Sequence, residues 1–328
     1  MSNDNELTVA LAQLAPVWLD RAATIEKMLA AIDEAAEEHA QLVCFGESLL
    51  PGYPFWPERT NGAVFESTVQ KELHALYLTQ AVCIEQGHLD PICERAARHG
   101  ISVILGTAER PLDRGGHSIY CSLVSIAADG RVQHVHRKLM PTYEERLTWS
   151  PGDGNGLRTH PLGAFTVGAL NCWENWMPLP RAALYAQGED LHVAIWPGAD
   201  RNTRDITRFI AKEGRSFVLS VSGLMRPADF PADTPYLDQI LEQDEPFLAN
   251  GGSCIAGPDG EWLLEPQTER EGVFIATLNH QRVLEERQNF DPAGHYSRPD
   301  VTRLEVNRER QSTVHFSDSD QGPATPAE

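Results

Sequence analysis

The sequence lacks the features that would direct it to a membrane or to a nucleic acid. None of its apolar runs reaches the roughly 18 residues that a membrane-spanning helix needs. It carries only 27 lysines and arginines against 47 aspartates and glutamates, a formal charge of −20. A chain this acidic repels phosphate backbones and anionic lipid. We therefore expect no nucleic acid and no membrane among its partners.

The chain is also poor in cysteine and in targeting signals. Its first residues, Met1 to Glu6, are polar and acidic and lack the basic and apolar regions of a signal peptide. Six cysteines in 328 residues are far too few for a disulfide scaffold, and none forms a C-x-x-C pair. We expect a cytoplasmic protein with reduced cysteines. Those at 44, 121 and 254 lie in apolar, strand-like runs and are expected to be structural.

Metal-binding spacings are missing as well. The twelve histidines are scattered and contain no H-E-x-x-H motif. His134 and His136 alternate along an expected strand, which favours a sheet surface over a metal pair. We expect neither a metal nor a cofactor.

What the sequence does contain is a long alternation of helix and strand patterns. Strands are expected over residues 7–13, 41–45, 102–106, 119–126, 132–136, 191–196, 216–222, 251–256, 261–264 and 272–278, with another starting at 165. Helices are expected from an Asp20 cap to about residue 39, and over about 66–80, 90–99, 178–187 and 203–214. The alternation continues to about residue 286 without a linker, which predicts a single α/β domain over residues 1–310. An irregular insert is expected over about 225–249, and the polar segment 311–328 is predicted to be disordered.

One stretch, beginning at Phe165, joins an apolar strand to a helix start. Pro178 and Pro180 suit a first helical turn, because proline is tolerated there. Cys172 stands at the junction. A side chain on such a turn points out of the sheet end, and nearby backbone N–H groups remain free to receive an anion. Cys172 is therefore our candidate nucleophile.

Two further strand ends carry complementary groups. Glu47 follows the strand over residues 41–45, and Lys138 follows the strand over 132–136. In open α/β sheets, sites form beyond the carboxyl ends of the strands. A thiolate needs help to form near neutral pH, which a carboxylate base or neighbouring cation supplies, and fast, selective alkylation of Cys172 would support a depressed pKa for its thiol and a catalytic role.

These positions lie in three extended motifs that resemble one family. The motifs are Phe45-Gly-Glu47-Ser-Leu-Leu-Pro-Gly-Tyr-Pro54, His136-Arg-Lys138-Leu-Met-Pro-Thr-Tyr-Glu-Glu145-Arg-Leu-Thr-Trp149-Ser-Pro-Gly-Asp-Gly154 and Gly168-Ala-Leu-Asn-Cys172-Trp-Glu-Asn-Trp-Met-Pro-Leu179. They resemble the motifs of the nitrilase branch of the carbon–nitrogen hydrolase superfamily. The resemblance spans roughly residues 6–305, and its second motif is highly specific.

The resemblance implies a four-layer α-β-β-α sandwich and an enzyme that hydrolyses a small-molecule nitrile to an acid and ammonia. It implies that Cys172 attacks the nitrile carbon to give a covalent thioimidate and that Glu47 is the general base. Lys138 and the backbone N–H of Trp173 would stabilise the tetrahedral intermediates. Glu145 would be a second carboxylate that holds Lys138 or the substrate. The family further implies a homodimer that pairs through helices, or a larger, spiral oligomer.

The surrounding residues leave several points open. Tyr53 and Trp196 are expected to line an aromatic pocket. Glu174 is either functional or a structural carboxylate beside the cysteine. Asn175 stands where many family members carry histidine, which leaves the substrate class open.

Three other functions compete with a nitrilase. The first is an amidase or N-carbamoyl amino-acid hydrolase with the same groups, although the contexts of Cys172 and Glu145 favour a nitrile. The second is a cyanide-processing enzyme. The third is a non-catalytic binding protein on the same fold, which is disfavoured because every chemistry-bearing position holds a competent residue type.

Overall fold

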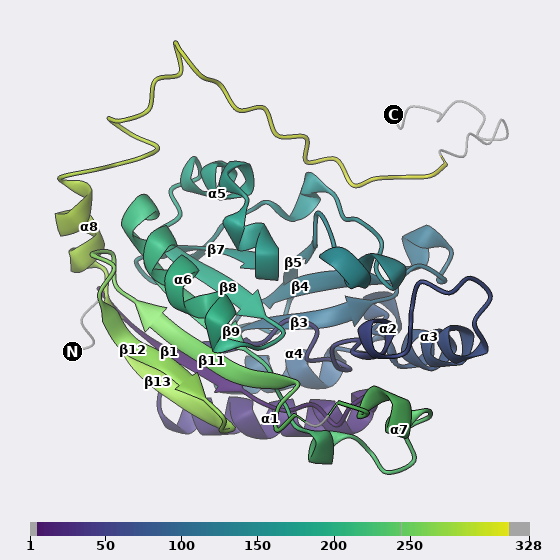
Figure 1. The fold of residues 1–328 in the computed structure, drawn as a ribbon. Helices are drawn as coiled ribbons and strands as arrows, with labels where there is room; N and C mark the ends of the chain where they lie inside the picture. The colour runs from purple at the N-terminus through teal and green to yellow at the C-terminus, as the bar shows by residue number, and fades with distance from the viewer. Residues whose placement is uncertain (1–4, 244, 315–328) are drawn as a thin grey trace, which may run out of the picture.

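Two twisted sheets lie face to face in the centre of the molecule (Figure 1). The computed structural model describes residues 5–243 and 245–314. One sheet has six strands in the order β13-β1-β2-β3-β4-β5. The other has seven, in the order β10-β11-β9-β8-β7-β6, with β12 paired to β11. In both sheets the central strands run parallel, as the β1–β2–β3 and β7–β8–β9 pairings show.

The strands are β1 (Glu6–Gln13), β2 (Leu42–Phe45), β3 (Ser102–Glu109), β4 (Tyr120–Ile126), β5 (Val132–Arg137), β6 (His160–Leu162), β7 (Phe165–Asn171), β8 (Leu191–Trp196), β9 (Phe217–Ser222), β10 (Leu224–Met225), β11 (Ala249–Ala256), β12 (Trp262–Thr268) and β13 (Gly272–Asn279). The α-helices are α1 (Arg21–Glu37), α2 (Trp56–Arg59), α3 (Thr68–Gln80), α4 (Asp90–His99), α5 (Pro178–Tyr185), α6 (Asp200–Gly214), α7 (Leu237–Ile240) and α8 (Gln281–Arg287). Short 3₁₀ turns include η3 (Tyr143–Leu147), η4 (Gly154–Gly156) and η5 (Cys172–Trp176).

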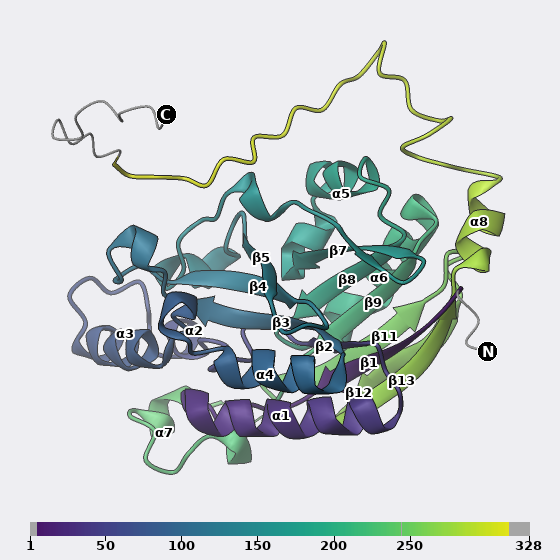
Figure 2. The same ribbon diagram turned by 180° about the vertical axis from the view of Figure 1, so that it is seen from behind.

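The apolar side chains separate into layers that follow the sheets. The facing sides of the two sheets share one core, to which Leu11 of β1, Cys44 of β2 and Val193 of β8 belong. On the outer faces, α1 and α4 cover the six-stranded sheet, and α5 and α6 cover the seven-stranded sheet (Figures 1 and 2). Each sheet thus buries both faces, which is why its parallel strands read as continuous apolar runs. The predicted four-layer α-β-β-α sandwich is confirmed.

Local signals set the ends of the covering helices. The carboxylate of Asp20 accepts a hydrogen bond from the Ala23 N–H and caps α1 at its N-terminus, as expected. Helix α4 ends at Gly100, whose φ of +64° lies in the left-handed region that glycine adopts without strain. Both helices lie side by side on the outside of the six-stranded sheet (Figure 2).

Several expectations need correction or lie outside the structure. His136 is fully buried instead of lying on a sheet surface, because the face of β5 that it shares with His134 is turned toward the second sheet. The insert over about 225–249 is not wholly irregular, since it contains α7 and the short strand β10. Of the segment predicted to be disordered, residues 315–328 lie outside the described residues. The backbone N–H of Gln311 donates to Asp153 at 3.0 Å.

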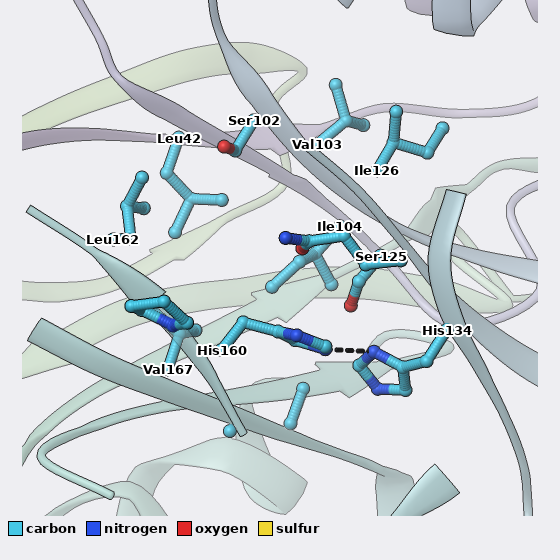
Figure 3. A pocket seen from close by; sticks show the side chains of 14 residues that line it. Leu42, Ser102, Val103, Ile104, Ser125, Ile126, His134, His160, Leu162 and Val167 are labelled. Carbon is cyan, nitrogen blue, oxygen red and sulfur yellow. Dashed lines mark hydrogen bonds between the residues drawn. The ribbon is translucent and has the colours of Figure 1, made fainter. Parts of the chain in front are cut away.

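No helix among the described residues is both long and apolar enough to cross a membrane. A small cavity of about 30 Å³ opens between the edges of the two sheets (Figure 3). His134 of β5 and His160 of β6 contact one another at its rim through their ring nitrogens. Burial lowers the pKa of His134 to about 3, so this ring is neutral. The cavity shares no lining residue with the cleft described next.

Candidate active site

Cys172 occupies a sharp turn between a strand and a helix. Strand β7 ends at Asn171, and Cys172 follows with a φ of +45°, in the left-handed region that few residues other than glycine adopt. The turn η5 and the proline-rich start of α5 come next. This conformation turns the chain away from the sheet and directs the backbone N–H of Trp173 toward the Cys172 sulfur. Strain of this kind is typical of functional turns.

Glu47 lies beyond the end of β2, in the six-stranded sheet. Its backbone N–H donates to the carbonyl of Trp196 in the other sheet at 3.0 Å, so one hydrogen bond ties the ends of the two sheets together. Gly106 of β3 makes room for this crossing, because a Cβ there would lie 2.6 Å from the Glu47 Cα. The Glu47 side chain is fully buried.

Lys138 lies just past the end of β5 and reaches two carboxylates. Its Nζ is 2.9 Å from Glu47 Oε1 and 2.7 Å from Glu145 Oε2, and none of the three side chains is more than 3% exposed. The ammonium also lies 5.5 Å from the ring centre of Trp149, within the range of a cation–π contact. A buried ammonium is thus held between two carboxylates and an aromatic face.

Glu145 is fixed on the turn η3 by hydrogen bonds to both of its oxygens. Oε2 accepts from the Thr142 N–H at 2.6 Å, in a capping-box arrangement, and from Lys138. Oε1 accepts from the Tyr53 hydroxyl at 3.0 Å. The structure therefore places Glu145 where it can orient Lys138.

The structure brings Cys172, Glu47 and Glu145 into one cluster, with ligand-type atoms that all lie within 4.8 Å of one another. Among the described residues this is the one group of three or more His, Cys, Asp or Glu side chains close enough to hold a metal ion. The ammonium of Lys138 lies within 3 Å of both carboxylates, so a positive charge already occupies the position that a metal would take.

Burial and charge set the proton positions in this cluster. Burial raises the pKa of Glu47 to about 7, against the opposing charge of Lys138. For Lys138, burial alone would lower the pKa, but Glu47, Cys172 and Glu145 raise it well above its usual value, so the amine stays charged. The cluster combines a cation with a carboxyl group that can exchange a proton near neutral pH.

The Cys172 thiol does not have the depressed pKa that fast alkylation would support. Burial, reinforced by the negative charge of Glu47, raises the pKa of the thiol well above its usual value, and Lys138 only partly opposes this effect. The residue is 2% exposed, so a thiolate there would have little water around it. Cys172 therefore rests as a thiol and needs a base to take its proton.

A cleft of about 620 Å³ leads from the surface to Cys172. Tyr53 and Trp173 line it, as do Gln243 and residues 245–248 from the insert and the first two residues of β11. Trp196 does not line it, contrary to expectation. Its side chain is fully buried and packs in the core cluster that contains Cys172 and residues of α6, with Nε1 donating to Ser220 Oγ at 3.3 Å.

Asn175 and Glu174 lie behind the turn instead of in the cleft. Asn175 is fully buried, and its amide donates to the carbonyl of Cys172 at 2.8 Å, so it supports the turn and does not face a bound molecule. Its Oδ1 contacts His192 Nε2 at 2.7 Å. Glu174 is 1% exposed and contacts His136. Asn175 therefore gives no information about the substrate class.

Two groups of the site were not recognised in the sequence. Trp149 lies in the second motif, and its place beside Lys138 could have been suspected from that position. His136 contacts Glu174, which lies 38 positions away in the chain, and no local sequence pattern predicts this contact.

Sequence comparison places the chain in a family. A model for the carbon–nitrogen hydrolase family matches residues 8–288. The chain belongs to the carbon–nitrogen hydrolase family. Among members of the family, a protein named Nitrilase 2 from an unknown prokaryotic organism is 37% identical over 322 residues, 98% of both chains. An aliphatic nitrilase of Rhodococcus rhodochrous is 32% identical and aligns with 95% of this chain and 85% of its own length.

Solved structures of carbon–nitrogen hydrolases share the fold. One from Helicobacter pylori G27 superposes with a TM-score of 0.68 and 18% sequence identity, covering 90% of this chain and 97% of that chain. An amidase from Nesterenkonia sp. superposes with a TM-score of 0.62 and 16% identity, covering 86% and 94%. At these identities the likeness establishes the sandwich and not the substrate.

Proposed function

We propose that this protein is a nitrilase that converts an organic nitrile and two waters to a carboxylic acid and ammonia. The observation that carries this proposal is the buried Lys138 ammonium held between Glu47 and Glu145 beside the Cys172 thiol. Family membership and relatives named as nitrilases support the choice of a nitrile.

In the first half of the reaction, Glu47 takes the thiol proton as the Cys172 sulfur attacks the nitrile carbon. Burial and the charge of Glu47 raise the pKa of the thiol, so the attack depends on a base that takes its proton. Negative charge develops on the nitrile nitrogen, and in this proposal the Lys138 ammonium and the Trp173 N–H stabilise it. Glu47 then delivers the thiol proton to that nitrogen, which gives a covalent thioimidate and leaves the Glu47 carboxylate ionised for the next step.

In the second half, Glu47 removes a proton from a water that attacks the thioimidate carbon. Glu47 gives this proton to the nitrogen, and the proton of the new hydroxyl also moves to the nitrogen as the oxygen becomes the thioester carbonyl, so that the C–N bond breaks and ammonia leaves. A second water then attacks the remaining thioester by the same route and releases the acid and the free thiol. A carboxyl group with a pKa of about 7 suits this alternation of base and acid.

The test is ammonia release from a panel of aliphatic, aromatic and arylacetonitriles, with Cys172→Ala as the comparison. We expect the wild-type protein to release ammonia and the corresponding acid, and the variant to lose turnover while keeping its fold by circular dichroism. Residual activity above a few per cent in the variant would contradict covalent catalysis by Cys172.

The alternative is an amidase or N-carbamoyl amino-acid hydrolase, since the same cluster can attack an amide carbon. The structural similarity to an amidase supports the fold of this alternative and no more. Ammonia from amides or carbamoyl compounds, with nitriles inert, would favour it. Turnover of cyanide alone would identify a cyanide-processing enzyme.

We also propose that the protein is cytoplasmic, folds as one domain over residues 1–310, and forms at least a dimer. The six free cysteines support a reducing compartment, and the pairing of β13 with β1 along its full length ties the two ends of the domain together. Leu179 of α5 and Phe209 of α6 are 62% and 49% exposed on the outer helical layer, which supports pairing through helices. A monomeric mass in light scattering at micromolar concentration would contradict the dimer.

A further inference from the structure

A second buried carboxylate, Glu174, lies on the Cys172 turn itself. Glu174 is 1% exposed, follows Cys172 by two residues, and is not among the described residues that line the cleft. It cannot reach a bound molecule, and the reaction described above does not use it. Its contacts are nevertheless concentrated on the two segments that carry the reacting groups.

Three donors converge on this carboxylate. Oε1 accepts from the Leu139 N–H at 2.5 Å, and Oε2 accepts from the Asn171 N–H at 3.0 Å and faces His136 Nε2 at 3.0 Å. His136 and Leu139 lie on either side of Lys138. Asn171 lies directly before Cys172. One side chain thus holds the backbone that carries the ammonium and the backbone that carries the thiol.

The chemistry of these contacts requires an ionised carboxylate. The backbone N–H groups of Leu139 and Asn171 each donate to one oxygen, and the Nε2–H tautomer of His136 suits an ionised carboxylate as a third donor. Burial alone would raise the pKa of Glu174, but His136 and the two backbone N–H groups hold it below its usual value. The side chain is therefore charged, rigid and fully paired.

We infer that Glu174 is a positioning residue that sets the distance between the Lys138 ammonium and the Cys172 sulfur. This inference rests on the proposed function of those two groups. Both lie on segments that leave different sheets, β5 and β7, so the register between them depends on a bridge. Glu174 provides that bridge with one hydrogen bond to a backbone N–H on each segment.

The main experiment replaces Glu174 with glutamine, which keeps the size and removes the charge. We expect kcat for the best nitrile to fall by ~10–100-fold with KM nearly unchanged, because a displacement of about 1 Å in a reacting group costs up to ~100-fold. Displacement of Lys138 would also remove part of the charge that opposes the rise in the Glu47 pKa. The acid limb of the pH profile should therefore move to higher pH.

A readout that needs no substrate separates this inference from the proposed function. The rate of Cys172 alkylation by iodoacetamide, followed by peptide mass spectrometry across a pH series, should show the same shift in the Glu174→Gln variant. If the wild-type protein releases no ammonia from nitriles, the proposed function fails while this comparison still tests Glu174. If kcat and the alkylation profile both match those of the wild type, Glu174 is only structural and the inference is wrong.

The matched control is Asp190→Asn. Asp190 is also a buried carboxylate that accepts a backbone N–H, from Thr166 at 2.7 Å, and faces a histidine, His280 Nε2 at 2.8 Å. It precedes β8 and so lies at the opposite end of that strand from Trp196. We expect this variant to lower Tm while leaving kcat per folded molecule and the alkylation profile unchanged.

Two further variants keep the test decisive if the glutamine variant does not fold. Glu174→Asp keeps the charge but shortens the reach, and His136→Gln keeps a donor while leaving both backbone contacts in place. We expect a larger loss of kcat in Glu174→Asp than in His136→Gln, because the backbone contacts fix the distance. The reverse order would overturn the inference.

Discussion

Two buried glutamates near Cys172, Glu47 and Glu174, have pKa values that are shifted in opposite directions. Glu47 faces one ammonium group, and burial raises its pKa to about 7. Glu174 receives two backbone N–H groups and a histidine, and its pKa is lowered. Both are no more than 2% exposed. Burial alone therefore does not decide which carboxyl group exchanges protons near neutral pH. The number of hydrogen-bond donors that face each carboxyl group decides it.

The difference assigns the two glutamates to different tasks. A carboxyl that gains and loses a proton near neutral pH can act as base and acid in turn, which is what Glu47 does in the proposed reaction. A carboxylate held ionised by three donors keeps its charge and its place. The following experiments would break or sharpen this contrast.

Glu47→Gln should produce the largest effect in this series. The amide cannot take a proton from the thiol or from water, so we expect kcat to fall by ~10³-fold or more. The fold should persist, because Lys138 still pairs with Glu145. Steady-state kinetics with circular dichroism measure both properties, and a loss below tenfold would show that another group is the base.

Lys138→Met should lower kcat by ~100–1,000-fold, since a neutral side chain cannot offset the charge that develops on the substrate nitrogen. The buried carboxylates of Glu47 and Glu145 then lose their cation, and the acid limb of the pH profile should move to higher pH. A variant with normal kcat and raised KM would assign Lys138 to binding alone.

The pH dependence should separate the two glutamates directly. We expect kcat/KM to fall with an apparent pKa of about 7 as the pH is lowered, because Glu47 must be ionised to act as a base.

The contributions of Glu47 and Glu174 to the stability of the fold should change with pH in opposite directions. The raised pKa of Glu47 contributes stability at low pH that is lost as the pH rises from about 4.5 to about 7. The lowered pKa of Glu174 contributes stability above its ordinary pKa that is lost as the pH falls.

Melting curves from pH 8 down to well below pH 4 check this contrast, because the Glu174 contribution is lost only below the ordinary glutamate pKa of 4.5. As the pH rises, the Tm of Glu47→Gln should increase relative to that of the wild type. As the pH falls, the difference by which the Tm of Glu174→Gln lies below that of the wild type should become smaller. Parallel curves for both variants would mean that the two carboxyl groups titrate alike.

Tyr53→Phe should produce the smallest change. Its hydroxyl donates to Glu145 at 3.0 Å and lies one group removed from the reacting atoms. A single hydrogen bond of this kind contributes ~1 kcal/mol, so we expect kcat to fall by about fivefold. No change in kcat would show that Thr142 and Lys138 alone hold Glu145.

The sequence predicts the layers well because their signals are local. The cap at Asp20, the glycine after α4 and the apolar runs of β1, β7 and β8 each depend on neighbouring residues. The turn at Cys172 was also recognisable, from an apolar strand followed by prolines. Glu47 and Lys138 could be predicted because each follows the end of a strand, and the structure places both beside the cysteine.

Contacts between residues that are far apart in the chain are harder to predict from the sequence. Strand β8 is buried on both faces, so alternation gives no sign of which way Trp196 points, and it faces α6 instead of the cleft. The bond between His136 and Glu174 and the raised pKa of the Cys172 thiol both arise from packing between the sheets. Such contacts depend on the assembled fold and not on neighbouring residues.

The cleft draws its walls and its chemistry from different parts of the chain. The groups proposed to react follow strand ends, whereas Gln243 and residues 245–248 come from the insert. Directed evolution confined to that wall segment would therefore retune which molecules enter without disturbing bond breaking. The insert is the natural target for engineering a biocatalyst from this scaffold.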